Sequence, residues 1–93
     1  MRKMYKYGVC SKTGLVKLPS CAVPLKFAFQ KGKLCLWAEV FETSEDLLCE
    51  KRFFIVGTGH PIIEESSVYI DTVFDGEFVW HIYECTGDFR IIE

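Results

Sequence analysis

The residues best suited to chemistry lie in one short segment, Gly57-Thr58-Gly59-His60-Pro61, which follows an apolar run. Backbone N–H groups in a glycine-rich turn can form a concave anion site, and Thr58 and His60 would add a hydroxyl and an imidazole donor. The segment lacks the Gly-Lys-Ser/Thr ending of a P-loop and does not match the dinucleotide fingerprint. It is therefore interpreted either as a site for a small anion or as a turn that ends a strand, because glycine permits a bulge and proline stops pairing.

A second group of candidate residues is predicted to lie on one face of a sheet, away from the main apolar rows. This face would carry Trp37, Tyr69, Val73, Val79, His81 and Tyr83. Aromatic side chains on the second face of a small sheet need a cover, so we expect a homodimer or a higher homo-oligomer through this face. The candidate ligand-binding residues are Gly57, Thr58, Gly59, His60, Trp37, His81 and Tyr69.

The inventory for catalysis is poor. The sequence contains no Gly-x-Ser-x-Gly elbow, no His-Glu-x-x-His motif and no cysteine–histidine cluster with zinc-ligand spacing. We therefore expect no catalytic residue, no metal and no cofactor, and the protein is not expected to be an enzyme. The alternative is a small hydrolase that acts on a phosphate ester through His60 and His81.

Composition favours one folded domain, residues 1–93. Hydrophobic residues make up 49% of the chain and aromatic residues 15%, which is enough for one modest core. The net charge of −2 argues against non-specific binding to duplex nucleic acid, which needs basic surface to release phosphate counterions. Lysines are denser in the first third of the chain, where they could form a local basic face or simply the solvated side of strands.

Turn residues recur every eight to twelve positions between runs rich in Val, Ile, Phe, Tyr and Trp. This rhythm predicts a mainly β fold, a small antiparallel sheet or barrel-like domain of about six to eight short strands. Helix is expected to be scarce, with short turns at most in 42–50 and 61–67. A two-residue turn at Lys31-Gly32 would pair Phe29 with Leu34 and Phe27 with Leu36, on one apolar face.

The second predicted hairpin contains a conflict between its turn and its apolar pattern. A two-residue turn at Asp75-Gly76 would place Asp71 opposite Trp80. The apolar pattern instead requires an odd loop or a β-bulge, which would bring one set of large side chains onto the same face. Burial of that set outweighs the turn preference, so we expect the odd loop or the bulge. The set is Val68, Ile70, Phe74, Phe78, Trp80 and Ile82.

The cysteines favour a reducing compartment. Their number is odd, no pair has Cys-x-x-Cys spacing, and no apolar signal or membrane-spanning run is present. We expect a cytoplasmic protein without disulfide bonds among Cys10, Cys21, Cys35, Cys49 and Cys85.

Three segments in order, LCLWA at 34–38, RFFIVGTGHPI at 52–62 and YIDTVFDGEFVWHIYE at 69–84, resemble a family of short proteins found in bacteriophages and prophage regions. The resemblance covers residues 4–84, and the family has no assigned activity. The chain departs from the pattern at Asp71, where the family usually has glycine, and a carboxylate there would alter an anion site in the glycine-rich segment. Its tail, 85–93, extends past the usual end and is expected to add an edge strand.

The resemblance implies a biological setting in the cytoplasm of an infected host. We expect an anti-defence protein for immune evasion, which binds and sequesters a small anionic signalling molecule, a nucleotide derivative, without converting it. A phage accessory protein that inhibits a host or defence protein by direct contact is the first alternative, and the phosphate-ester hydrolase is the second.

Overall fold

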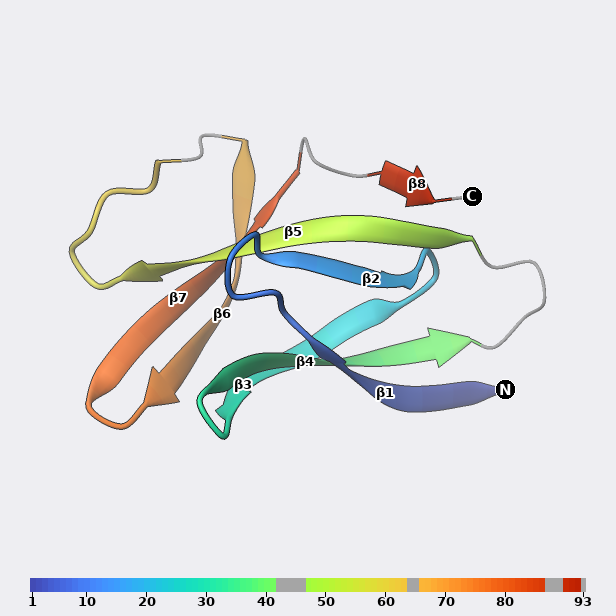
Figure 1. The fold of residues 1–93 in the computed structure, drawn as a ribbon, viewed down its shortest axis with the longest axis horizontal. Coiled ribbons are helices and arrows are strands. Elements are labelled where there is room, and N and C mark those ends of the chain that lie inside the picture. The colour runs from blue at the N-terminus through green and yellow to red at the C-terminus, as the bar shows by residue number, and fades with distance from the viewer. Residues whose placement is uncertain (42–46, 64–65, 87–89, 93) are drawn as a thin grey trace.

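A computed structural model describes residues 1–41, 47–63, 66–86 and 90–92, and these residues form strands connected by turns (Figure 1). The mainly β fold predicted from the sequence is confirmed. None of the described residues belongs to a helix long and apolar enough to cross a membrane. In chain order the strands are β1 (Arg2–Gly8), β2 (Leu15–Pro19), β3 (Val23–Gln30), β4 (Lys33–Phe41), β5 (Leu48–Gly57), β6 (Ser67–Asp75), β7 (Phe78–Cys85) and β8 (Arg90–Ile92).

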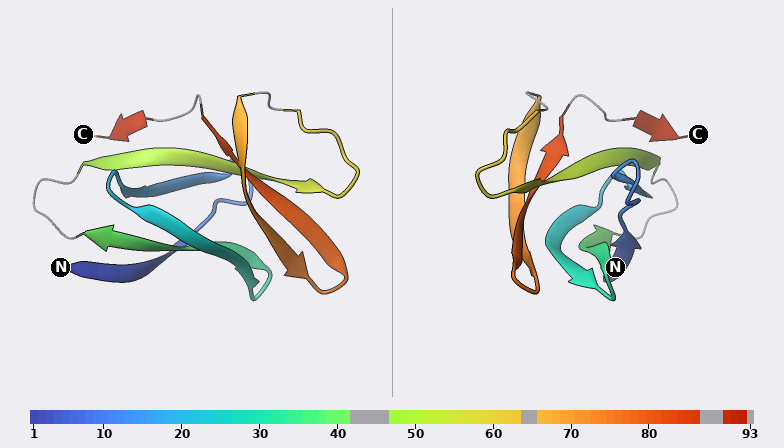
Figure 2. Two further views of the ribbon diagram at one scale, coloured as in Figure 1. Left: turned by 180° about the vertical axis from the view of Figure 1, so that it is seen from behind. Right: turned by 60° about the vertical axis from the view of Figure 1, so that its left-hand side comes forward.

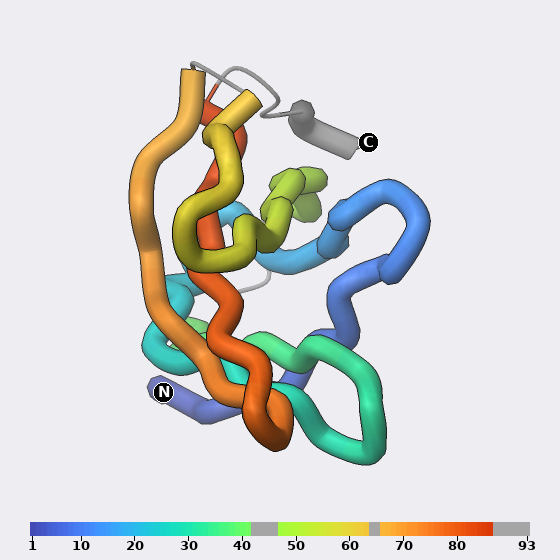
Figure 3. The backbone as a smooth tube through the Cα atoms, turned by 90° about the vertical axis from the view of Figure 1, so that its left-hand side faces the viewer, coloured from blue at the N-terminus to red at the C-terminus, as the bar shows by residue number. Residues whose placement is uncertain are grey.

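The strands form two antiparallel sheets. The first has the order β1-β4-β3, and the second has the order β2-β5-β7-β6, with β8 paired to the start of β5. Figure 2 shows the β6–β7 hairpin crossing the long β5 strand, while the first sheet lies to one side of it. In Figure 3 the loop after β5 arches in front of that strand, close to β7. The loop after β5 and the β6–β7 hairpin therefore meet near the end of β5.

The β3–β4 hairpin follows the sequence prediction. Phe29 pairs with Leu34 and Phe27 with Leu36, across a two-residue turn at Lys31-Gly32. Both turn residues have positive φ, 52° and 77°, as a type I′ turn requires. The alternation of β4 buries Leu36, Ala38 and Val40, and it leaves Trp37, Glu39 and Phe41 on the opposite face.

The β6–β7 hairpin contains a β-bulge, one of the two irregularities expected, and only half of the predicted apolar row meets the core. Ile82 is buried, and Ile70 and Trp80 pack against the core, whereas the other three members are exposed, namely Val68, Phe74 and Phe78. The register shifts between Tyr69 and Asp71, and the two-residue turn is Gly76-Glu77. Beyond the bulge Val73 pairs with Trp80 and is buried, whereas Phe74 faces the other way and is 71% exposed. The bulge alters register at Ile70, so the even-numbered residues on its two sides do not share a face.

The core joins the two sheets through an edge-to-face contact between Phe27 and Phe53, whose ring centroids lie 5.0 Å apart. Other fully buried side chains from both sheets complete it, among them Leu18, Leu36 and Ile82. A polar link lies beside this contact. Asp71 Oδ2 on β6 accepts hydrogen bonds from the backbone N–H of Phe27 and from the Lys26 ammonium, each at 3.2 Å.

The structure also describes parts of the tail and of the two segments expected to form helical turns, as well as the cysteines. The tail adds a strand, because β8 pairs with the start of β5. Most of the helical turn expected at 42–50 lies outside the described residues, and Leu48–Glu50 belong to β5 instead. In the 61–67 segment, Ser67 begins β6 and residues 61–63 are not helical. Cys35, Cys49 and Cys85 are buried.

Candidate functional site

The segment Gly57 to His60 forms a tight turn at the end of β5. The backbone N–H of His60 donates to the carbonyl of Gly57 at 3.0 Å, and Gly59 has φ of +85°. A positive φ at the third position is the requirement of a type II turn, and glycine meets it without strain. The interpretation as a strand terminator therefore describes the backbone correctly. It also removes the His60 N–H from any anion nest, because that donor is already used.

The side chains of this turn are built into a polar relay. Thr58 Oγ1 lies 2.8 Å from Nε2 of His81, and the other ring nitrogen, Nδ1, lies 3.0 Å from Thr72 Oγ1. The Thr72 hydroxyl is in turn 2.5 Å from the phenol oxygen of Tyr69. Pairing of Val56 with His81, and of Thr72 with His81, explains why these groups meet, since residues opposite each other in an antiparallel ladder share a face. We call these four residues, Thr58, His81, Thr72 and Tyr69, the hydroxyl–imidazole relay.

Aromatic rings surround one end of the relay. Phe54 stacks on Tyr83 with centroids 5.5 Å apart, and Tyr83 meets Tyr69 edge to face at 5.8 Å. Phe54 and Tyr83 pair directly across β5 and β7, so their rings lie on the same face as His81. Tyr69 is 52% exposed, and the relay ends at this accessible phenol.

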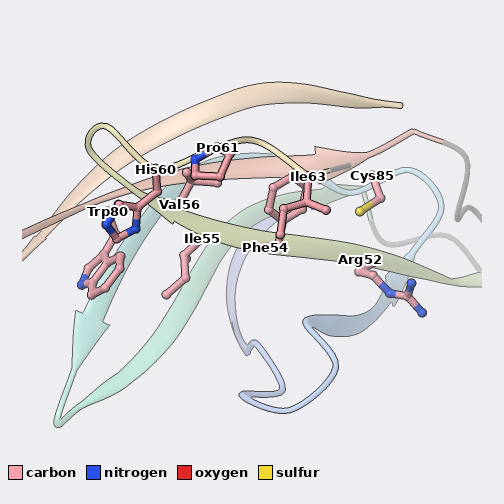
Figure 4. A pocket seen from close by; sticks show the side chains of 10 residues that line it. Arg52, Phe54, Ile55, Val56, His60, Pro61, Ile63, Trp80 and Cys85 are labelled. Carbon is pink, nitrogen blue, oxygen red and sulfur yellow. The ribbon is translucent and has the colours of Figure 1, made fainter. Parts of the chain in front are cut away.

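A cleft of about 660 Å³ lies along β5 beside the turn (Figure 4). Trp80 and His60 are neighbours at one end of it, while Pro61 and Ile63 extend over Val56 and Phe54. Phe78, on the hairpin tip, stacks on Trp80 with centroids 6.1 Å apart and prolongs the aromatic surface. The Arg52 guanidinium points away from Trp80 in Figure 4, whereas the His60 side chain adjoins the indole. The full lining is Arg52, Phe54, Ile55, Val56, Gly57, His60, Pro61, Ile63, Trp80 and Cys85.

Gly57 lets the His60 ring lie against the backbone of β5. A methyl group at position 57 would lie 2.9 Å from Nδ1 of His60, so the imidazole packs directly on the glycine backbone. Gly57 pairs with Trp80, and the next pair along the ladder, Val56 with His81, faces the opposite way. The two histidines therefore lie on opposite faces of β5. The arrangement predicted for a hydrolase, with His60 and His81 acting together, is not assembled.

The predicted site residues thus divide into three groups. Thr58, His81 and Tyr69 are brought together in the relay, and His60 lies with Gly57 in the cleft. Trp37 belongs to β4 in the other sheet, so the predicted single face that combined it with Tyr69 and Tyr83 does not exist. Val73 also leaves that face, because it is buried in the core.

Asp71 corrects a further expectation. Its carboxylate points to β3 and not to the glycine-rich turn, so it does not act on an anion site there. Burial raises the pKa of Asp71, but the hydrogen bonds from Phe27, Lys26 and Thr72 outweigh burial and bring the pKa below its ordinary value. Asp71 therefore holds the two sheets together as an ionised group.

Sequence reasoning missed three residues of this region. Trp80 was assigned to the apolar row, and it packs against the core, but it also lines the cleft, which was not expected; neither Thr72 nor Phe54 was selected. The signal for Thr72 was the turn, because with Gly76-Glu77 as the two turn residues the register pairs Thr72 with His81. No group of three His, Cys, Asp or Glu side chains suited to a metal ion occurs in the described part of the chain.

Comparison with known proteins gives a family. Residues 1–90 match the family model described as a domain of unknown function, DUF7352. The chain belongs to the DUF7352 family. No curated protein and no solved structure matches this DUF7352 domain.

Proposed function

We propose that this DUF7352 protein binds and sequesters a small nucleotide derivative without converting it. The observation that carries the proposal is the cleft beside β5, where an indole and an imidazole adjoin in a mostly apolar lining. Its volume is in the range typical of small-molecule sites. A flat, aromatic group such as a nucleobase would stack on Trp80 at one end of this cleft, because aromatic rings favour stacking.

The relay supports a ligand that is anionic as well as aromatic. When His81 is neutral, one ring nitrogen donates and the other accepts, so the relay can leave a free hydroxyl proton at only one of its ends. When His81 is protonated, both nitrogens donate, and the hydroxyl protons of Thr58 and Tyr69 are both directed outward. An anion can accept hydrogen bonds from hydroxyl protons that point outward. Thr58 and His60 belong to one turn, so a nucleotide bound by both would pass around this turn, with its phosphate at Thr58 and its base in the cleft.

Sequestration accounts for the relay better than hydrolysis does. A histidine that activates a nucleophile is usually oriented by a third group, most often a carboxylate, which stabilises the imidazolium. In this site the third group is the neutral hydroxyl of Thr72. His60, the second histidine of the hydrolase alternative, lies on the other face of β5.

The resemblance to bacteriophage and prophage proteins supplies the biological part of the proposal. A small protein that traps a host immune signal in the infected cell's cytoplasm would act as an anti-defence protein. Inhibition of a host or defence protein by direct contact is the competing function, and the exposed rings of Phe74 and Phe78 are the observation in its favour.

Self-association is part of the same proposal. Phe74 and Val79 pair next to the hairpin tip on the face that β6 and β7 share, and Phe74 is 71% exposed. A second copy placed on this end of the face would bury the Phe74 ring, as the hydrophobic effect favours, and would leave the Tyr69 end of the relay to the ligand.

The test is ligand uptake by purified protein. The protein is incubated with a panel of cyclic and linear nucleotides, separated from unbound ligand and heated, and the released molecule is identified by mass spectrometry. Release of an unchanged nucleotide supports sequestration, and release of a converted one supports the hydrolase. Failure to take up any nucleotide would overturn the proposal and leave direct protein contact.

Substitutions in the cleft test whether the ligand binds there. Trp80→Ala and His60→Ala should each weaken binding by about tenfold or more, since stacking on an aromatic side chain contributes roughly 1–3 kcal/mol per base. Lys17→Ala, on the exposed surface of β2, is the matched control and should bind like the wild type. Equal affinity for all three variants would show that the cleft is not the site.

A further inference from the structure

The two halves of the chain carry opposite charge. Residues 1–41 contain eight lysines and arginines and a single carboxylate, Glu39, whereas residues 42–93 contain twelve carboxylates and three lysines and arginines. The first sheet, β1-β4-β3, is built entirely from the basic half. The small net charge of the whole chain therefore conceals one strongly basic sheet.

The outer face of the first sheet places a tryptophan between two lysines. Lys6 on β1 and Lys26 on β3 both pair with Trp37 on β4, so the three side chains form one row across the sheet. The indole is half-buried and both lysines are exposed. Lys6 reaches across β4 to donate to the Gln30 side chain at 2.7 Å, and Lys26 contacts Asp71 at the edge of the sheet. The Lys6 ammonium is therefore held across the face that carries the indole, while the Lys26 ammonium is held at the edge of that face by Asp71.

A second aromatic residue repeats this arrangement at the far end of β4. Phe41 pairs with Arg2, whose guanidinium carbon lies 5.9 Å from the centroid of the ring. Phe41 is 52% exposed. Trp37 and Phe41 are four residues apart on one strand, which corresponds to about 13 Å. Glu39 lies between them, and Arg2 neutralises it through an ion pair at 3.2 Å.

We propose that this face, defined by Arg2, Lys6, Lys26, Lys33, Trp37 and Phe41, binds single-stranded nucleic acid. Single strands are held by aromatic side chains on which bases stack and by cations that track the phosphates, and this sheet presents the two kinds of group side by side. A duplex is a poor occupant, because its bases are already stacked and do not reach a flat sheet. The binding should tolerate many sequences, since every base has a face that can stack.

The site is independent of the cleft beside β5. It lies on the other sheet and shares no residue with the cleft or with the hydroxyl–imidazole relay. Trp80→Ala should therefore leave the binding of single strands unchanged, while it weakens the binding of a small nucleotide.

The experiment is fluorescence anisotropy with fluorescein-labelled 12-mers of oligo-U and oligo-dT, titrated with the full chain at several salt concentrations. We expect saturable binding that weakens with salt, with a slope of about −2 to −3 in log K against log salt, because three or four phosphate contacts contribute about −0.7 each. A labelled duplex of the same length should bind more weakly than either single strand.

Matched variants separate stacking from charge. Trp37→Ala should weaken binding by about tenfold, and Trp37→Phe should weaken it less because a ring remains. The double variant Lys6→Gln/Lys33→Gln should weaken binding and make the salt slope shallower by about 1.4. Lys12→Gln/Lys17→Gln, which removes two exposed lysines outside this face, should bind like the wild type. Circular dichroism melts confirm that each variant is folded.

Three outcomes would overturn the proposal. The first is no change in anisotropy at low salt with any single strand. The second is equal loss of affinity in the two double-lysine variants, or duplex binding as tight as single-strand binding, since either result would indicate general charge attraction. The third is salt-sensitive self-assembly that Lys6→Gln/Lys33→Gln abolishes while no oligonucleotide binds, which would assign the basic face to the acidic half of another copy.

Discussion

The Asp71 carboxylate on β6 accepts a hydrogen bond from the backbone N–H of Phe27 on β3, and this 3.2 Å contact connects the two sheets beside their aromatic core. The same oxygen is paired with Lys26. A strand-edge N–H is thereby satisfied by a side chain from the other sheet, at the place where β3 and β6 approach each other.

Asp71→Asn should destabilise the protein at neutral pH by about 1–2 kcal/mol, because a charge-assisted hydrogen bond and an ion pair are weakened. The pKa of Asp71 is lowered in the folded protein, so its contribution is complete above the unfolded value near 3.9 and is lost as pH falls through the folded value. Urea denaturation at a series of pH values measures this. The difference between variant and wild type should shrink towards zero in acid. Asp75→Asn, at the exposed hairpin tip, is the control. A difference in the free energy of unfolding between Asp71→Asn and the wild type that does not change with pH would refute this role of the Asp71 carboxylate.

Cys10 should be the first thiol to react with iodoacetamide. It is exposed, and hydrogen bonds from the Thr13 side chain and then from the backbone N–H groups of Thr13 and Lys12 lower its pKa. Burial raises the pKa of the Cys49 thiol, which should react last. Thr13→Ala should slow the alkylation of Cys10, whereas Thr13→Ser retains the hydroxyl and should not. Mass mapping of the alkylated cysteines over time at pH 7 measures the order of reaction. Faster labelling of Cys49 than of Cys10 would contradict this prediction.

Phe74→Ser should reduce self-association without loss of stability. Phe74 is 71% exposed on the face proposed for a second copy, so the folded monomer buries little of it. Light scattering coupled to size exclusion measures the mass of the assembly. Phe41→Ser removes an exposed ring from the other sheet and serves as the control. A wild-type protein that is monomeric at high concentration would refute self-association through this face.

Local sequence signals predicted the β3–β4 hairpin because its turn and its apolar alternation agree on one register. Lys31-Gly32 meets the dihedral requirement of the turn, and the same register buries Phe27 against Leu36. At β6–β7 the two signals disagree. An odd loop or a bulge was expected there, but the position of the bulge at Ile70 depends on packing against β3, which no short-range pattern encodes.

The same limitation explains the partial success at the candidate site. Thr58, His60, His81 and Tyr69 were selected by residue type, and three of them meet in the relay. Their division between two faces depends on the pairing of β5 with β7, which joins segments more than twenty residues apart. Trp37 was grouped with Tyr69 because alternation shows which residues share a face within a strand. It does not show which strands share a sheet.

The hydroxyl–imidazole relay makes one final prediction, a coupling between Thr58 and Thr72 that passes through His81. Each hydroxyl is hydrogen-bonded to one ring nitrogen of His81. Removing one hydroxyl therefore changes the donor or acceptor role that the ring takes towards the other hydroxyl. Thr58→Val and Thr72→Val keep the branched shape, and each should cost about 0.5–1.5 kcal/mol in the free energy of unfolding. The double variant should differ from the sum of the two single variants by at least about 0.5 kcal/mol, as groups in one network do. Thr58→Val combined with Thr86→Val is the control, because Thr86 Oγ1 donates to the Ser66 carbonyl outside the relay. Urea denaturation of both cycles provides the measurement. Additive losses in the Thr58–Thr72 cycle would mean that the two hydroxyls act separately and that His81 transmits nothing between them.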